Sequence, residues 1–211
     1  LYRENTGGNA LQVSIGYPGQ ATTLMPQSIL FGGAALRGLA GDSGSTLRLL
    51  PGASLVLAQN ADTEHAGTIA GDASTSVQKN GVGTLTLTHE NAGFAGTYRI
   101  IAGALRVGNG GATGSLGPTA AVLVEAAGTL VFDRTGTVTV SGPLAGTGRI
   151  VLDGPGEVYV TSTNAFAGTV VINNGRLTLA PGATLGTAAV VTNTAALEVE
   201  TTGSLLQGGV M

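Results

Sequence analysis

The sequence lacks cysteine and tryptophan altogether and carries little charge, since Asp, Glu, Lys and Arg make up 10% of its 211 residues. Without cysteine the chain forms no disulfide, although this absence does not decide its compartment. Lys79 is the one lysine, and the other basic residues are scattered singly through a chain with a net charge of −3. No basic stripe is available for a phosphate backbone, so nucleic acid is not an expected partner.

Long hydrophobic runs are also missing. No segment approaches the roughly 18 consecutive apolar residues that a membrane-spanning helix requires. Residues 1–5 do not have the architecture of a signal peptide, and the chain does not begin with Met. We therefore interpret the sequence as a fragment of a longer protein.

Glycine and aliphatic side chains are abundant. The chain has 36 Gly, while aromatic residues supply only 4%, so Val, Leu, Ile and Ala must fill the interior. Apolar runs of four to six residues are bounded by Gly, Pro, Asn, Asp or Thr, which is typical of strands joined by turns. Helix-period patterns are hard to find. The sequence therefore predicts an all-β fold.

One stretch of the sequence occurs twice. The segment that begins at Gly81 returns at Gly154, and both copies continue through an Asn, a Phe, a Gly-Thr pair and a later Gly. The repeated positions are Gly83, Asn91, Phe94, Gly96 and Gly103 in the first copy and Gly156, Asn164, Phe166, Gly168 and Gly175 in the second. Because the unit carries almost no charge, we interpret these as structural positions kept for backbone geometry.

The repeated side chains have separate expected roles. Phe94 and Phe166 each stand two residues before a Gly-Thr corner and are predicted to pack inside the fold. Asn91 and Asn164 are predicted to bond corner backbone groups, which a stacked ladder of strands cannot satisfy.

Glycine-bearing corners recur through the chain at a quasi-period. The glycines at 83, 103, 128, 156, 175 and 203 are separated by 19 to 28 residues. The Asn-Gly steps at Asn80, Asn109 and Asn174 fall in corners or in a Gly-rich loop, not between hairpin strands. This pattern predicts a right-handed parallel β-helix of about eight or nine coils, each covered by the coils above and below it.

We expect a single β-helical unit over residues 1–211. Residues 1–45 repeat more weakly and are predicted to form irregular N-terminal coils. The two repeat copies span 78–117 and 151–186, and the Gly-rich segment 108–118 is predicted to be a flexible insertion between coils.

These residues resemble the passenger-associated transport repeat of bacterial autotransporters, also called the autotransporter-associated β-strand repeat. The resemblance rests on 81–88, Asn91, 94–97, 100–108 and 114–117, and the second, more diverged copy over 154–186 ends in Ala183-Thr184-Leu185-Gly186. It implies a β-helical passenger stalk of a secreted or cell-surface protein of a Gram-negative bacterium, often an adhesin, a protease or another virulence factor. It implies membrane contact only through a translocator barrel that lies outside this chain.

The function expected on these grounds is a structural stalk segment that supports adhesion or self-association and export. The expected partner is a host-cell receptor, the host matrix or a second copy of the chain. Arg176, in the exposed-looking Asn174-Gly175-Arg176, is a weaker candidate for receptor contact. We expect no enzymatic activity, no cofactor and no bound metal.

The alternative is a β-helix that degrades or binds polysaccharides. Such a site needs acids that converge on one face of adjacent coils, and Asp133, Arg134, Asp153 and Glu157 lie about one coil apart. The competing interpretation of these residues is solvated corner charge.

Two further patterns, one of histidines and one around a serine, do not predict a metal site or a protease. His65 and His89 lack the spacing of metal ligands. Ser43 stands in Gly41-Asp42-Ser43-Gly44, which is similar to the nucleophile sequence of chymotrypsin-like proteases, but no pattern of hairpins surrounds it. We interpret that tetrapeptide as a turn.

Overall fold

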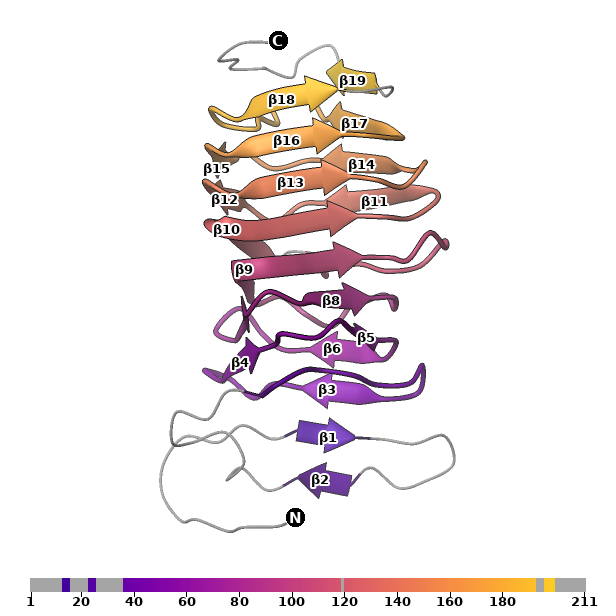
Figure 1. Ribbon diagram of the computed structural model, residues 1–211, viewed down its shortest axis with the longest axis vertical. Coiled ribbons are helices and arrows are strands. Elements are labelled where there is room, and N and C mark those ends of the chain that lie inside the picture. The colour runs from indigo at the N-terminus through magenta and orange to yellow at the C-terminus, as the bar shows by residue number, and fades with distance from the viewer. Residues whose placement is uncertain (1–12, 16–22, 26–35, 119, 193–195, 200–211) are drawn as a thin grey trace.

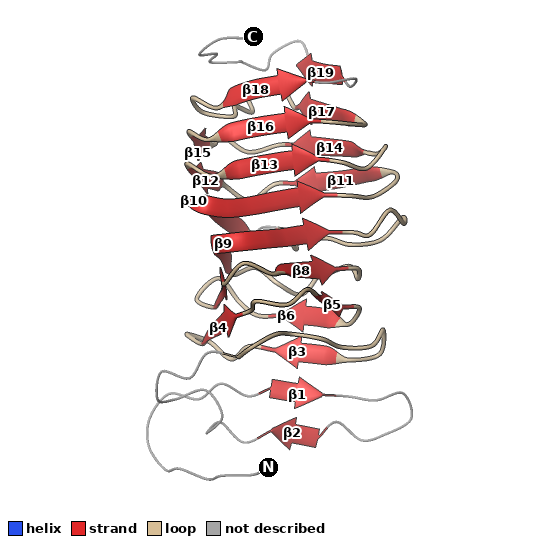
Figure 2. Cartoon of the chain, in the orientation of Figure 1, coloured by secondary structure: helices blue, strands red, loops and turns tan. Residues whose placement is uncertain are grey.

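The computed structural model describes residues 13–15, 23–25, 36–118, 120–192 and 196–199, with side chains over 36–118 and 120–188. Every regular element in this part of the chain is a strand (Figure 2). The strands are β1 (Val13–Ile15), β2 (Thr23–Met25), β3 (Thr46–Arg48), β4 (Ser54–Ala58), β5 (Thr63–His65), β6 (Thr68–Ala70), β7 (Ser76–Asn80), β8 (Thr84–Leu87), β9 (Thr97–Val107), β10 (Ala121–Phe132), β11 (Thr137–Val140), β12 (Leu144–Gly146), β13 (Arg149–Leu152), β14 (Glu157–Val160), β15 (Ala165–Phe166), β16 (Thr169–Ile172), β17 (Arg176–Leu179), β18 (Ala189–Thr192) and β19 (Ala196–Val199). The described residues contain no helix that is long and apolar enough to cross a membrane.

Strands one coil apart in the sequence lie side by side and run parallel. Arg149 of β13 lies opposite Thr169 of β16, which in turn lies opposite Ala189 of β18. A second sheet has the order β11, β14, β17 and β19. Figure 1 shows these strands stacked as the layers of a rod, along which the chain climbs toward its C-terminus. The predicted all-β parallel β-helix is confirmed.

The number of coils is lower than predicted. The solenoid has about six turns, whereas the sequence predicted eight or nine coils over the whole chain. One reason is that most of residues 1–35 and the last twelve residues lie outside the described part. Another is that coils vary in length: Thr97 pairs with Ala121, so that coil takes 24 residues, whereas Arg149 pairs with Thr169 after 20.

The N-terminal part of the described chain departs from the parallel pattern. Among the described pairs, β1 and β2 alone are antiparallel, with Val13 opposite Met25. They fall within 1–45, where the sequence predicted irregular coils, but most of that segment lies outside the described residues. Regular stacking begins where β3 pairs with β6.

The core is a column of aliphatic side chains inside the rod. In β8, Leu85 and Leu87 point inward and are fully buried, while Thr84 and Thr86 face outward. The same alternation recurs in β11 and β14, and these inward residues belong to the main apolar cluster along the rod. Val131, Val151 and Val171 form a second, smaller cluster. Because the next coil covers each inward side chain, the stability of any coil depends on its neighbours.

Strands β9 and β10 are longer than the sequence indicated. The sequence indicated strands of four to six residues, but the apolar runs 98–101 and 104–107 join into β9, which has 11 residues. Gly103 adopts φ +68° inside it, which lets the chain bend. The pairing with β10 shifts register between Val124 and Ala127 and then resumes as far as Val107. On the side of the rod between β6 and β11, by contrast, residues 89–92 and 114–118 form no strand.

Candidate functional site

Asn91 lies where the strand ladder is interrupted and joins three successive coils. Its Oδ1 accepts the N–H of Ile69 from the preceding coil at 2.7 Å, and its Nδ2 donates to the carbonyl oxygen of Ser115 in the following coil at 2.6 Å. The N–H of Asn91 donates to the Ser115 hydroxyl at 2.9 Å. The side chain is fully buried, so it supplies bonds that neither water nor a strand provides there.

Asn164 makes the same set of bonds in the second repeat copy. Its Oδ1 accepts the N–H of Leu144 at 2.7 Å, and its Nδ2 donates to the carbonyl oxygen of Thr184 at 2.7 Å. Its own N–H donates to the Thr184 hydroxyl at 3.1 Å. The two asparagines therefore bond corner backbone groups, which is the contact expected of them from the sequence.

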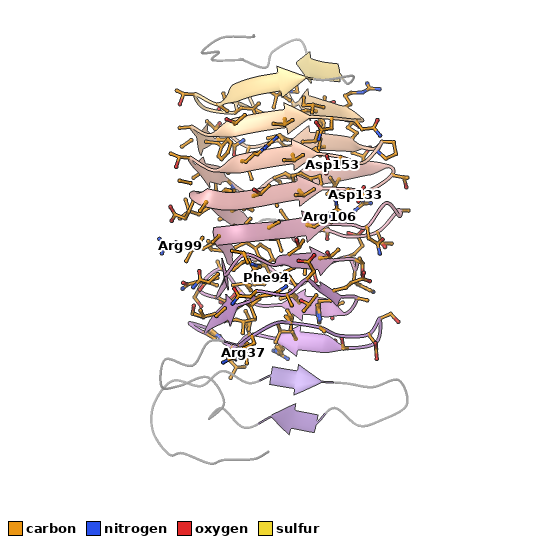
Figure 3. The ribbon with its side chains drawn as sticks, viewed as in Figure 1. Arg37, Phe94, Arg99, Arg106, Asp133 and Asp153 are labelled. Carbon is orange, nitrogen blue, oxygen red and sulfur yellow. The ribbon has the colours of Figure 1, made fainter. Side chains whose placement is uncertain are left out.

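Phe94 and Phe166 lie inside the coils, and neither side chain has any exposed surface. The ring of Phe94, labelled within the rod in Figure 3, packs at 4.6 Å between centroids against the ring of Tyr98. The Tyr98 hydroxyl is buried without a hydrogen-bond partner among the described residues, and burial raises the pKa of this phenol. These rings fill the core and are not available to stack on a sugar.

Gly96 and Gly168 follow the two phenylalanines and make room for them. A Cβ on Gly168 would lie 2.0 Å from the carbonyl oxygen of Gly148 and 2.7 Å from Cζ of Phe166. A Cβ on Gly96 would meet Cζ of Phe94 at 2.8 Å. Glycine is required here because the ring and the backbone of the preceding coil occupy the space that a side chain needs.

The corner glycines stack backbone on backbone from coil to coil. Gly103 and Gly175 adopt φ +68° and +71°, and a Cβ on Gly175 would lie 2.2 Å from the carbonyl oxygen of Gly156. Gly83 and Gly156 are packed in the same way: a Cβ on Gly83 would lie 2.5 Å from the carbonyl oxygen of Ala61, and a Cβ on Gly156 would lie 2.2 Å from that of Gly136. The ten repeated positions thus occupy bends and contacts between coils and do not line a cleft.

The acidic residues singled out from the sequence come together only in part. Arg106 lies between two of them, with Nη1 at 3.1 Å from Oδ2 of Asp133 and Nη2 at 3.7 Å from Oδ2 of Asp153 (Figure 3). Oδ1 of Asp153 also accepts a hydrogen bond from Nδ2 of Asn173 at 2.6 Å. Asp133 and Asp153 therefore share one cationic partner, Arg106, which the sequence analysis did not select.

Arg134 takes no part in this group and instead holds the Gly-rich segment 108–118. Its Nη2 donates to the carbonyl oxygen of Ala112 at 2.6 Å, and its Nη1 donates to that of Gly114 and to Oε1 of Glu90. The side chain of Arg134 is only 11% exposed. The segment predicted to be a flexible insertion is thus fastened to the rod by Arg134.

Glu157 lies on the outer side of β14 and bonds residues other than those that contact the two aspartates. Its carboxylate accepts hydrogen bonds from the hydroxyls of Thr178 at 2.5 Å and Thr137 at 3.0 Å. These hydroxyls, Thr178 foremost, with a smaller contribution from Arg176, lower the pKa of Glu157. The four residues of the polysaccharide hypothesis are therefore divided among three separate contacts.

The histidines and Ser43 form no site together. His65 is 2% exposed, and burial lowers its pKa, while Nε2 lies 3.4 Å from the carbonyl oxygen of Thr68. Ser43 is exposed in a turn closed by the N–H of Ser45 bonding to the carbonyl oxygen of Asp42 at 2.9 Å. Within the described residues no group of three or more His, Asp or Glu side chains could hold a metal.

Lys79 is a residue whose position sequence reasoning missed. It is 1% exposed, and its Nζ donates to the carbonyl oxygens of Gly81 at 2.9 Å, Asn80 at 3.2 Å and Ala102 at 3.3 Å. Burial lowers its pKa. The alternation in Ser76–Asn80 was the available signal, because it places position 79 on the same inward face as Val77.

Comparison with known proteins agrees with this architecture. The passenger-associated transport repeat family matches residues 77–107 and 145–179, which overlap the two repeat copies. The chain is 42% identical over 89 residues to the Adhesin BmaC autotransporter of Brucella suis biovar 1 (strain 1330). That alignment covers 41% of this chain and 2% of the relative, so the chain corresponds to a small part of such a protein. No solved structure matches.

A parallel β-helix whose repeated residues lie at its corners and between its coils is a β-solenoid. The chain carries two passenger-associated transport repeats, at residues 77–107 and 145–179, and in this it is similar to the passengers of bacterial autotransporters. It is accordingly part of a surface-exposed or secreted protein of a Gram-negative bacterium.

Proposed function

We propose that this segment is a non-enzymatic stalk of the passenger, which supports adhesion or self-association and takes part in export. The observation that supports this proposal is that polar side chains of the repeats and corners make their bonds to neighbouring coils. Arg106 bridges Asp133 and Asp153, and the two repeat asparagines bond the coils on either side of them. Such groups hold a rod together, and both acids of this cluster, Asp133 and Asp153, are paired with Arg106.

The adhesive role is inferred from the relative. That protein is named an adhesin, and 89 residues of this chain align with it. We propose a host-cell receptor, the host matrix or a second copy of the chain as the partner, reached through the outward faces of the coils. The inward faces are occupied by the core.

The polysaccharide alternative is disfavoured by the same geometry. A glycosidase needs one carboxyl group in the protonated form and another that is free to act as base or nucleophile. Arg106 holds both aspartates as ion pairs, and Glu157 is held as a carboxylate by two hydroxyls. Incubation with acidic polysaccharides, followed by a reducing-end assay, should give no release of sugar. Release that is lost in Asp153→Ala would overturn the proposal.

Deletion of one complete coil tests the stalk function directly. Thr169 pairs with Arg149, so removing residues 149–168 joins Gly148 to Thr169 and brings β16 onto β10 in register. A stalk should keep its cooperative unfolding, and beads coated with it should bind host-cell monolayers or one another as the full chain does. Removing only residues 149–158 breaks the register and should abolish folding. Loss of all adhesion in a folded one-coil deletion would mean that this coil holds a discrete binding site.

A further inference from the structure

The three Asn-Gly steps of the chain have different surroundings. A backbone nitrogen that follows Asn can attack the side-chain amide, and glycine offers no Cβ to hinder the approach. Such a reaction needs the reacting atoms about 3–3.5 Å apart and free to close. Asn80, Asn109 and Asn174 therefore provide an internal comparison of one chemistry in three settings.

At the Asn174-Gly175 step the backbone nitrogen contacts the side-chain amide that it would attack. The N–H of Gly175 donates to Oδ1 of Asn174 at 2.9 Å, so the nitrogen lies beside the carbonyl group that it would attack. Asn174 is exposed at the corner between β16 and β17, where water and base have access. Gly175 has φ +71° and carries no side chain over the amide.

The other two steps are restrained. The N–H of Gly110 donates to the carbonyl oxygen of Asp133 at 2.7 Å, which holds that nitrogen away from the side chain of Asn109. At Asn80 the Oδ1 atom is buried, whereas Asn174 is exposed. Water and base therefore have less access to the side-chain amide of Asn80.

We propose that Asn174 is a site of spontaneous deamidation in the folded passenger. The deprotonated nitrogen of Gly175 forms a bond to Cγ of Asn174, and Nδ2 leaves as ammonia after taking up a proton. Water then hydrolyses the resulting succinimide at either carbonyl and leaves aspartate or isoaspartate at position 174. The net reaction consumes one water and releases one ammonia, with no change in oxidation state.

The modification alters a contact between coils. Both products place a new negative charge at the corner, and isoaspartate also adds a methylene to the backbone. Gly175 packs directly on the carbonyl oxygens of Gly154 and Gly156, so a longer backbone would disturb the pairing of β17 with β14. The first repeat copy has Ala102 where the second has Asn174, so it cannot undergo this reaction.

The test follows all three sites in one sample of the full chain. Native protein and protein unfolded in urea are kept in mildly alkaline buffer, and peptide mass spectrometry measures conversion of amide to acid at each step. We expect the native protein to react at Asn174 at least about tenfold faster than at Asn80 or Asn109, while the unfolded chain reacts comparably at all three. Isoaspartate should be detected at position 174 by enzymatic methylation.

Asn174→Ala provides the control, because it recreates the corner of the first copy. This variant should fold normally and lose the native signal, whereas Asn109→Ala should keep it. If native protein protects Asn174 as strongly as it protects Asn80 and Asn109, the proposal is wrong.

Discussion

Asn91 and Asn164 lie at the same point of the two repeat copies and bond the coils on either side through the same atoms. Each Oδ1 accepts an N–H from the preceding coil, and each Nδ2 donates to a carbonyl oxygen of the following coil. The partners in the following coil are Ser115 and Thr184, and the hydroxyl of each also accepts the backbone N–H of the asparagine. Both hydroxyl residues belong to the Leu-Gly endings of the repeat copies. In each copy the asparagine therefore bonds the residue near the end of the same repeat, Ser115 or Thr184.

Replacing either asparagine by alanine should destabilise the rod. Asn91→Ala or Asn164→Ala leaves buried backbone groups without partners, and each should lower the free energy of unfolding by about 1–3 kcal/mol. Urea unfolding followed by circular dichroism measures the loss. Asn174→Ala, at an exposed corner, is the matched control and should change stability by less than about 0.5 kcal/mol. A similar small effect at the two repeat positions would contradict the role given to them.

Gly96 and Gly168, which stand two residues after Phe94 and Phe166, should tolerate no side chain. In Gly168→Ala the new methyl group would meet the Gly148 carbonyl at 2.0 Å, so the coils must separate or the ring of Phe166 must move. We expect a loss of about 1–3 kcal/mol or more, as for other overpacked interiors. Gly111→Ala is the control, because its Cβ would come no closer than 3.6 Å to any neighbour. Equal melting temperatures for the two variants would show that the close packing at Gly168 is unimportant.

The parts of the fold that follow from local patterns were predictable from the sequence. Alternation and repeated glycines indicated the parallel β-helix, since they set which residues face inward and where the chain bends. The contacts of long polar side chains were not predictable, because they depend on which coils become neighbours. Arg134 was grouped with Asp133 by sequence, yet it reaches Glu90 and the loop carbonyls. From the sequence alone Lys79 would be taken for a solvent-exposed charge, because only the structure shows that position 79 of β7 faces inward.

Tyr98→Phe should leave the protein at least as stable and should reduce its sensitivity to alkali. The buried hydroxyl has no partner among the described residues, so its removal should raise stability by up to about 1 kcal/mol. Burial raises the pKa of Tyr98 above its usual 10.0. The unfolded state thus releases the phenol proton at a lower pH than the folded state. The contribution of the protonated Tyr98 to the free energy of unfolding is therefore fully present below pH 10.0 and is lost as the pH rises above it. Unfolding free energies across that range should fall less steeply in the variant than in the parent chain.

Lys79 should give a pH dependence of the opposite sign. Burial lowers its pKa from 10.5, so between the two values the unfolded state binds more protons than the folded state. Stability should therefore rise with pH toward 10.5. Lys79→Met keeps an apolar stem of similar length and should abolish this rise. The measurement is best made in Tyr98→Phe, so that the two effects do not overlap, and the absence of other lysines simplifies it. A rise that persists in the double variant would have to come from another group.

Arg134 should hold the segment 108–118 without being essential to the rod. Its side chain is largely buried and bonds the carbonyl oxygens of Ala112 and Gly114, so Arg134→Ala should release the loop while the core of aliphatic side chains stays intact. Limited proteolysis should then cut within 108–118 at least about tenfold faster, because cleavage follows the population of the open loop. Arg99→Ala is the control, since its ion pair with Glu125 is exposed and such pairs contribute at most about 1 kcal/mol. If the loop of Arg134→Ala resists protease as the parent does, the strands on either side, and not the guanidinium, fix its position. If the whole rod becomes sensitive instead, Arg134 is part of the folding core.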